Sequence, residues 1–154
     1  AATGVPFLVF CYHKELMTRI EDQLYRTLGG DYFRIDGDTP TPKRQEFVNA
    51  FQKGEYQVAI LSLLAASTGI TLTRSNIILF AEMYWTPGTM LQAEDRIHRI
   101  GQKNSCDIKY LIAGGTLDSY LFKKLNAKLA TVDTILDGAS NRSLSGERFV
   151  YDPT

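Results

Sequence analysis

Several features that would narrow the function of this sequence at once are scarce or missing. Its 154 residues include two cysteines, Cys11 and Cys106, which lack the paired spacing of a metal site. Each lies in an apolar, strand-like run, so we expect buried thiols and a reducing compartment. Seventeen basic side chains balance 17 acidic ones. The net charge therefore provides no general attraction to nucleic acid or to an acidic membrane, and any DNA contact must come from local patches.

Long apolar stretches and known catalytic loops are also missing. No run approaches the ~18 apolar residues of a membrane span, and no charged segment precedes an apolar core as in a signal peptide. Neither a Gly-x-x-x-x-Gly-Lys-Ser/Thr phosphate loop nor an Asp-Glu-x-His segment occurs. The chain opens almost directly into a strand-like run, so we expect it to be a fragment of a longer protein. Since no membrane span occurs, we expect no membrane partner.

Short apolar runs alternate with helical patterns along the chain. The helical patterns cover 14–28, about 42–53, about 88–100 and 117–129, and Thr39 or Thr41 is expected to cap the second and Thr116 the last. Gly29-Gly30 and Gly54 are expected to end the first two. The runs predicted as strands are 7–11, 32–35, 58–61, 77–80 and 108–112. This alternation predicts an α/β fold with a mostly parallel central sheet and helices on both faces, whose ligands bind at the carboxyl ends of the strands.

The sharpest chemical pattern lies between Gln92 and Gln102. Gln92, Arg96 and Arg99 are spaced i, i+4 and i+7, which places them on one face of a helix. Two guanidinium groups and an amide form a set of donors suited to phosphate oxygens. Spacing alone leaves an ordinary solvated face equally open, with Arg99 favouring the negative end of the helix dipole.

The sequence motif in this segment favours the phosphate-binding interpretation. Gln-x-x-x-Arg-x-x-Arg-Ile-Gly-Gln resembles motif VI of superfamily-two helicases, in the form found in SWI/SNF-type DNA-dependent ATPases. Other segments resemble the same family in the same order: 7–14, Arg34-Ile35-Asp36-Gly37, 61–73 and Trp85-x-Pro87. Phe80-Ala81-Glu82, Gln92-Ala93-Glu94-Asp95-Arg96 and Gly115-Thr116-Leu117-Asp118 are most similar to its annealing-helicase branch.

The resemblance implies the second RecA-like lobe of a motor, a three-layer sandwich spanning residues 1–137. It implies that Arg99 is an arginine finger, that Arg96 assists it on the ATP phosphates, and that Gln92 orients both. Gly69, Arg96 and Arg99 would contact the nucleotide, whereas Mg²⁺ would be held by the missing first lobe of the same parent chain. We therefore expect weak ATP binding and no hydrolysis by this lobe alone. The Ser-, Gly- and Arg-rich tail, 138–154, is expected to be poorly ordered up to Phe149.

The same resemblance points to contacts with the DNA backbone. One departure from the family pattern stands out: the segment from Ser62 to Thr68 lacks the arginine usual in motif V. One alternative also remains open, since each basic candidate could belong to a solvated face. Trp85 could brace DNA, couple the lobes or serve packing alone. The candidate nucleic-acid-binding residues are His13, Lys14, Arg44, Ser62, Thr68 and Trp85.

The leading hypothesis is therefore half of a DNA-translocating ATPase that anneals strands or remodels forks during DNA repair. Its expected partners are duplex or forked DNA and the first lobe, and its expected location is the nucleus if the source is eukaryotic, otherwise the cytoplasm. The alternative is a non-catalytic scaffold that keeps the fold and binds DNA or protein. The effect of Arg99→Ala on ATP hydrolysis separates the two.

Overall fold

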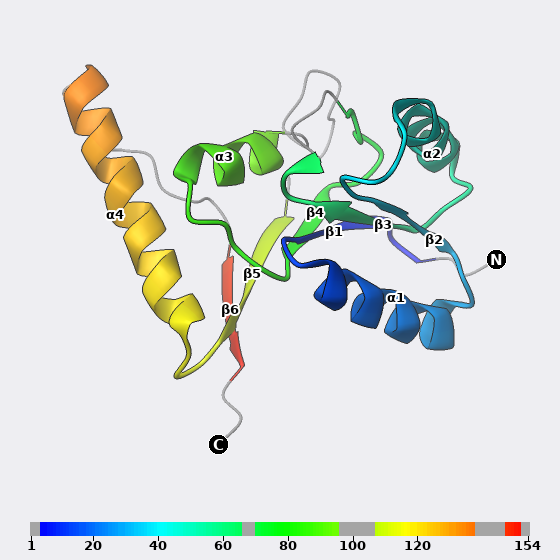
Figure 1. The fold of residues 1–154 in the computed structure, drawn as a ribbon, viewed down its shortest axis with the longest axis horizontal. Helices are drawn as coiled ribbons and strands as arrows, with labels where there is room; N and C mark the ends of the chain where they lie inside the picture. The colour runs from blue at the N-terminus through cyan, green and yellow to red at the C-terminus, as the bar shows by residue number, and fades with distance from the viewer. Residues whose placement is uncertain (1–3, 66–69, 96–106, 138–146, 152–154) are drawn as a thin grey trace.

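A computed structural model describes residues 4–65, 70–95, 107–137 and 147–151 of the chain (Figure 1). Within them four helices accompany six strands. The helices are α1 (Lys14–Leu28), α2 (Thr41–Lys53), α3 (Pro87–Asp95) and α4 (Leu117–Asp137). The strands are β1 (Phe7–Cys11), β2 (Tyr32–Ile35), β3 (Val58–Ser62), β4 (Ile77–Phe80), β5 (Asp107–Ala113) and β6 (Glu147–Tyr151).

All six strands form one parallel sheet in the order β2-β3-β1-β4-β5-β6. The apolar side chains of each strand alternate between its faces because the side-chain period of a strand is two. Val9 and Cys11 of β1 pack under α1, whereas Leu8 and Phe10 join the larger core. That larger core contains apolar residues of α2, α3 and α4, so helices cover both faces and the α/β prediction is confirmed.

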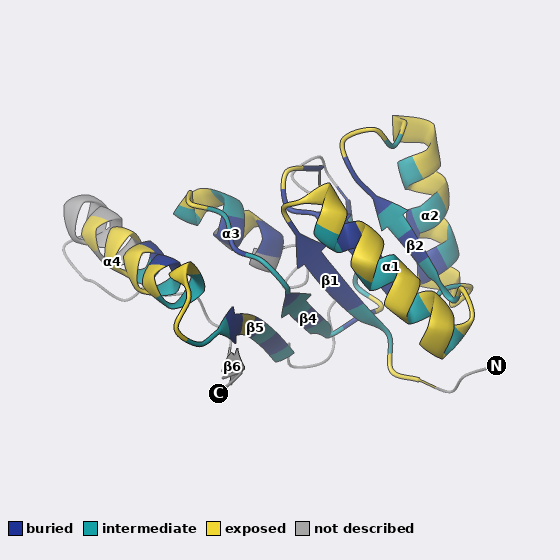
Figure 2. Cartoon of the chain, turned by 60° about the horizontal axis from the view of Figure 1, so that its bottom comes forward, coloured by how far each residue is buried: buried dark blue, intermediate teal, exposed yellow. Residues whose placement is uncertain are grey.

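The burial pattern follows the layers (Figure 2). Strand β1 lies at the centre of the sheet and is buried from Leu8 to Cys11. Helix α1 exposes one side and turns the other, with Met17 fully buried, toward the sheet. Strands covered on both faces read as continuous apolar runs in sequence, which is why β1 and β3 could be predicted from composition alone.

The ends of the helices partly follow the predictions. Gly29 and Gly54 follow α1 and α2 with φ of 67° and 87°, a left-handed conformation that glycine adopts without strain. Thr116 caps α4, since its Oγ1 accepts the Asp118 N–H at 3.2 Å. The predicted threonine cap of α2 is wrong: its N-cap is Pro40, and no side chain caps the helix.

Two elements extend beyond the predicted ones. Helix α4 continues to Asp137 rather than ending near Leu129. Strand β6 adds a sixth strand beside β5, with Phe149 opposite Leu111. Residues 147–151 are not predicted as a strand from the sequence, and the preceding tail segment, 138–146, lies outside the described residues. The sheet edge beyond β5 is thus formed by a segment far along the chain.

Candidate nucleic-acid and nucleotide site

The carboxyl ends of the strands form the edge where the candidate residues gather. After β1 the chain enters α1 on one face of the sheet, and after β4 it enters α3 on the other (Figure 1). Strands β1 and β4 are neighbours in the sheet although 65 residues, Tyr12 to Asn76, lie between them in the sequence. Connections that diverge between adjacent strands leave a crevice at their carboxyl ends, where open α/β sheets bind ligands.

A first hollow, here called the strand-end pocket, opens beyond β1, β2 and β3 and encloses about 500 Å³. It brings together four of the predicted nucleic-acid-binding residues, although they come from three separate segments. Its lining consists of Tyr12, His13, Lys14, Gly37, Arg44, Ser62, Leu64 and Ala65. Two cationic side chains and a hydroxyl on one concave surface suit a backbone phosphate.

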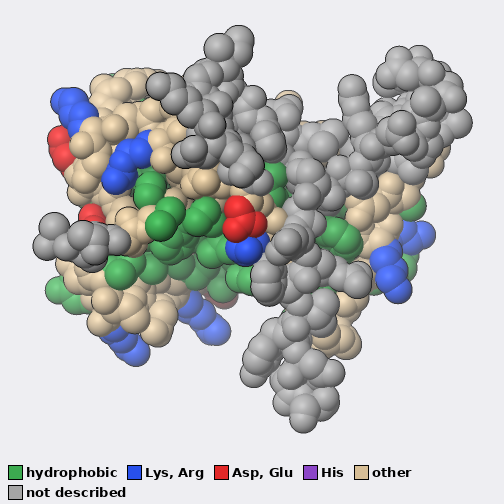
Figure 3. Space-filling view, turned by 180° about the vertical axis from the view of Figure 1, so that it is seen from behind, with side chains coloured by type: hydrophobic (Ala, Val, Ile, Leu, Met, Phe, Trp, Pro, Cys, Tyr) green, Lys and Arg blue, Asp and Glu red, His purple; other side chains and the backbone are tan. Residues whose placement is uncertain are grey.

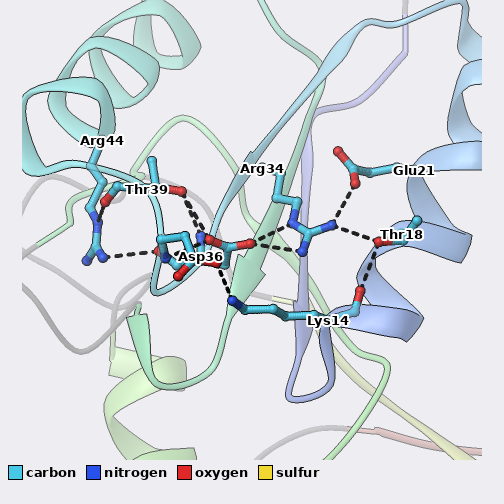
Figure 4. Close-up of polar contacts among 8 residues, drawn as sticks. Lys14, Thr18, Glu21, Arg34, Asp36, Thr39 and Arg44 are labelled. Carbon is cyan, nitrogen blue, oxygen red and sulfur yellow. Dashed lines mark hydrogen bonds and ion pairs between the residues drawn. The ribbon is translucent and has the colours of Figure 1, made fainter.

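Arg44 reaches this pocket from α2 and is fixed by the backbone. Its guanidinium donates to the carbonyl of Thr39 at 2.8 Å, to that of Asp36 at 3.1 Å and to that of Ala65 at 3.3 Å. Figure 4 shows the first two of these contacts from the side of the 36–39 loop. Arg44 therefore ties that loop to the segment after β3. This structural role was not among the predictions for Arg44, which were a solvated face or a phosphate contact.

The 36–39 loop is held from its other side by Arg34 of β2. The Arg34 guanidinium pairs with Glu21 of α1 at 2.8 Å and with the Asp36 carboxylate at 2.9 Å (Figure 4). Asp36 also accepts the Asp38 N–H at 2.9 Å, a turn typical of aspartate. Lys14 donates a hydrogen bond to the Asp38 carboxylate in an ion pair, and this bond raises the pKa of Lys14. The loop beside the pocket is thus a connected polar network.

The network decides the charge of Asp36. Burial alone would raise the pKa of this carboxyl, but the Asp38 N–H and the Arg34 guanidinium together hold the pKa below its ordinary value of 3.8. A carboxyl whose pKa is lowered in the folded state stabilises that state as the anion. Its contribution is complete above pH 3.8 and is lost as the pH falls through the lower pKa of the folded state.

We expect Asp36→Asn to lower the free energy of unfolding by about 1–3 kcal/mol near neutral pH, because the substitution weakens charge-assisted hydrogen bonds. Urea unfolding of both proteins at a series of pH values measures the difference, which should shrink below about pH 4. Asp22→Asn, a change of the same charge at an exposed position of α1, is the matched control. A difference that stays constant down to pH 2 would contradict the assigned role of the carboxylate.

A second hollow, here called the Trp85 pocket, lies on the other side of the Tyr12–His13 turn and encloses about 290 Å³. Trp85 follows β4, and its side chain is 47% exposed, so it is not a core residue. Lys128 of α4 donates to the Trp85 carbonyl at 3.3 Å. The lining consists of Tyr12, His13, Glu82, Met83, Tyr84, Trp85, Leu117, Asp118 and Leu121. The Trp85 pocket and the strand-end pocket therefore share the Tyr12–His13 turn as a common wall.

Only one of the residues predicted to act at the nucleotide, Gln92, lies among the described residues. Gln92 lies on α3 and is exposed, while the neighbouring Ala93 is buried in the core. Arg96 and Arg99 lie outside the described residues, as do Thr68 and Gly69. Helix α3 leaves the same sheet edge that carries both pockets, so the described part of the predicted arginine helix starts at the carboxyl ends of the strands.

The described part of the chain has neither a broad basic patch on the face shown nor a cluster of metal ligands. Figure 3 shows basic side chains scattered over the described surface seen from behind, without a single broad patch, in keeping with equal numbers of basic and acidic residues. Residues 4–65, 70–95, 107–137 and 147–151 hold no group of three or more His, Cys, Asp or Glu side chains able to bind a metal. None of the described helices has the length and apolarity needed to span a bilayer.

Cys11 ends β1 directly below the two pockets. It is a buried free thiol, as predicted. Burial, together with the negative charge of Glu82, raises its pKa to about 12. A thiol that stays protonated at neutral pH is a poor nucleophile, so we assign Cys11 to packing.

Sequence reasoning missed two residues that organise the site. Arg34 and Glu82 belong to segments that resemble the family but had no predicted role, yet Arg34 holds the 36–39 loop and Glu82 joins the ends of β1 and β4. Arg34 left a signal, since an arginine two positions before an aspartate at the end of a strand places both side chains on one face. Glu82 left none, because its partners lie about 70 positions away.

Comparisons with known proteins agree with this architecture. A family model described as the helicase conserved C-terminal domain matches residues 1–101. DNA annealing helicase and endonuclease ZRANB3 of Mus musculus is 44% identical over 140 residues, covering 90% of this chain. A SWI/SNF-related matrix-associated actin-dependent regulator of chromatin subfamily A-like protein 1, from Xenopus tropicalis, is 44% identical over 124 residues, covering 80% of this chain. The aligned part is 13% of each relative's length.

A solved structure gives the same fold. The crystal structure of the C-terminal part of the Fun30 ATPase domain superposes with a TM-score of 0.73 at 25% identity. The match covers 79% of this chain and 39% of that one. Family model, relatives and fold thus agree with the motifs read from the sequence. The chain belongs to the helicase conserved C-terminal domain family and is the second RecA-like lobe of a SWI/SNF-related protein.

Proposed function

We propose that this lobe is one half of a DNA-dependent ATPase motor that moves along duplex or forked DNA. The observation that carries the proposal is the convergence of Lys14, Arg44 and Ser62 on one pocket at the sheet edge from which α3 also starts. One edge of the sheet thus offers donors for a DNA backbone and leads into the sequence Gln92 to Arg99. A motor of this kind needs both functions on one rigid support.

The nucleotide half of the proposal concerns the arginines. Arg99 acts as an arginine finger on the terminal phosphate of ATP, Arg96 assists on the neighbouring phosphate, and Gln92 orients both. Guanidinium groups stabilise the charge that develops on the transferred phosphoryl group. The phosphate loop and the Mg²⁺ ligands belong to the first lobe, so the ATP site is complete only when the two lobes close. Gly69 contributes backbone contact to the nucleotide.

The nucleic-acid half concerns the strand-end pocket and its neighbour. His13, Lys14, Arg44, Ser62 and Thr68 contact the phosphate backbone, and Trp85 braces the strand from the adjacent pocket. Such contacts position the protein without reading sequence, and binding of this kind weakens steeply as salt rises. The neutral net charge supports local rather than general attraction.

The names of the relatives support a biological setting. ZRANB3 is named as a DNA annealing helicase, and the second relative as a chromatin regulator. We propose strand annealing or fork remodelling in DNA repair for the parent protein, and a nuclear location. The chain spans only 13% of the length of these relatives, so this setting is proposed for the parent protein and not for the lobe alone.

The test compares two proteins: the 154-residue chain and the full-length protein that contains it. We expect the chain alone to show no turnover of ATP, with or without duplex DNA, because half of the ATP site is missing. The full-length protein should hydrolyse ATP faster when DNA is added. Release of inorganic phosphate measures both rates. Turnover by the chain alone contradicts the shared site, and a full-length protein that binds DNA without hydrolysing ATP favours the scaffold alternative.

A further inference from the structure

Strands β1 and β4 lie side by side at the centre of the sheet, and the segments that follow them lead to the two pockets. The backbone pairing of these strands ends where the Ala81 N–H donates to the Phe10 carbonyl at 2.9 Å. Beyond it the two connections part, one toward α1 and the strand-end pocket, the other toward Trp85 and α3. Without a side chain to join them, the two pockets would stand on independent loops.

Glu82 supplies that joint. Its Oε2 accepts the backbone N–H groups of Tyr12 and His13, each at 2.8 Å. Its Oε1 lies 2.6 Å from Nδ1 of His13. One carboxylate from the β4–α3 connection thus accepts two backbone bonds and one side-chain contact from the turn after β1. Three short contacts to a single group leave that turn little freedom relative to the connection.

Both ends of this joint lead to the proposed working parts. Tyr12 and His13 line the strand-end pocket as well as the Trp85 pocket. On the other side, the Tyr84 N–H lies 3.3 Å from the Sδ of Met90, a buried residue of α3. Gln92 follows two positions later on the same helix. A continuous set of contacts therefore runs from the proposed DNA contacts through Glu82 to the start of the arginine segment.

We propose that Glu82 is a positioning residue that couples DNA binding in the strand-end pocket to the placement of α3. When DNA backbone occupies the pocket, the Tyr12–His13 turn and the β4–α3 connection move as one unit because Glu82 holds them together. This inference rests on the proposed motor function and adds the residue that transmits DNA binding to ATP hydrolysis. Glu82 itself touches neither DNA nor nucleotide in this scheme.

The experiment uses the full-length protein and three measured quantities: ATP hydrolysis without DNA, ATP hydrolysis with saturating duplex DNA, and the Kd for that DNA. Glu82→Ala should reduce the stimulation by DNA about tenfold, within the usual range of coupling between sites. Hydrolysis without DNA should stay within about twofold of the wild type, because no group of the ATP site is removed. Glu82→Gln should keep most of the stimulation, since a glutamine oxygen can accept the same two N–H bonds.

Matched controls separate coupling from folding. Glu55→Ala removes the same side chain from an exposed position between α2 and β3 and should leave all three quantities unchanged. Should Glu82→Ala lower the thermal midpoint, Glu82→Asp decides, because it keeps the charge but shortens the reach. Reduced stimulation in Glu82→Asp with normal hydrolysis without DNA supports the coupling.

Two results would overturn the inference. One is a wild-type stimulation in both Glu82→Ala and Glu82→Asp. The other is an equal loss of hydrolysis with and without DNA, which assigns Glu82 to general support of the fold. Failure of the proposed motor itself looks different: the wild-type protein then shows no hydrolysis for DNA to stimulate, whatever residue stands at position 82.

Discussion

Arg99→Ala in the full-length protein should lower the rate of DNA-stimulated ATP hydrolysis by about 10³–10⁵-fold, the range typical of an arginine finger. The reason is electrostatic. In the proposed motor the Arg99 guanidinium donates to phosphate oxygens whose negative charge develops in the transition state. Binding of ATP and of DNA should change far less, because most of their contacts belong to other residues. Single-turnover phosphate release with saturating DNA measures the effect.

Two further substitutions make this result specific. Arg99→Lys keeps the charge but loses the planar fork of donors, so its rate should fall between those of Arg99→Ala and the wild type. Arg26→Ala, an exposed arginine in the last turn of α1, removes the same side chain from the opposite end of the sheet and should leave hydrolysis unchanged. If Arg99→Ala keeps more than about a tenth of the wild-type rate, Arg99 is not a finger, and the scaffold alternative gains support.

Much of the fold could be predicted because the strands are buried on both faces. Val58–Leu61 and Phe7–Cys11 read as unbroken apolar runs, and glycines mark where helices end. Strand β6 could not be predicted in the same way, since Glu147 and Arg148 interrupt its apolar character. It is stabilised by pairing with β5, a contact between distant segments that local patterns do not reveal.

The site divides along the same line. The sequence placed Lys14 and Ser62 at strand ends and Arg44 at the start of a helix, and the three residues meet at one pocket. Their partners were not predictable, because those partners depend on strand order. Glu82 reaches the Tyr12–His13 turn only because β4 lies beside β1, and nothing local in a sequence specifies that neighbour.

Phe80 illustrates how the core supports this edge. Its ring stacks on Phe10 of β1 with centroids 5.2 Å apart and on Tyr110 of β5 with centroids 4.7 Å apart. All three side chains are fully buried, and they stand opposite one another in adjacent strands. Stacked aromatic pairs add to the free energy gained from burial. Phe80 is thus the middle member of a ladder that crosses the centre of the sheet.

Phe80→Ala should therefore lower the free energy of unfolding by about 3–5 kcal/mol. For a chain of this size the thermal midpoint should fall by roughly 6–20 °C. The loss exceeds simple transfer because the flanking rings in β1 and β5 cannot close the cavity without shifting their strands. Denaturant unfolding followed by circular dichroism measures the change, and Phe80→Leu, which fills most of the space, should cost less than half as much.

Tyr25→Ala provides the matched control for that loss. Tyr25 is an aromatic side chain of α1 that is 65% exposed, so its removal should change stability by no more than about 0.5 kcal/mol. A loss below about 1 kcal/mol in Phe80→Ala would contradict the ladder as the centre of the core. Because Phe80 stands two residues before Glu82, a cavity beneath it should also loosen the contact between β4 and the Tyr12–His13 turn. Stability and DNA stimulation of ATP hydrolysis should then both fall in Phe80→Ala. In Glu82→Ala the fall in DNA stimulation should not depend on a loss of stability.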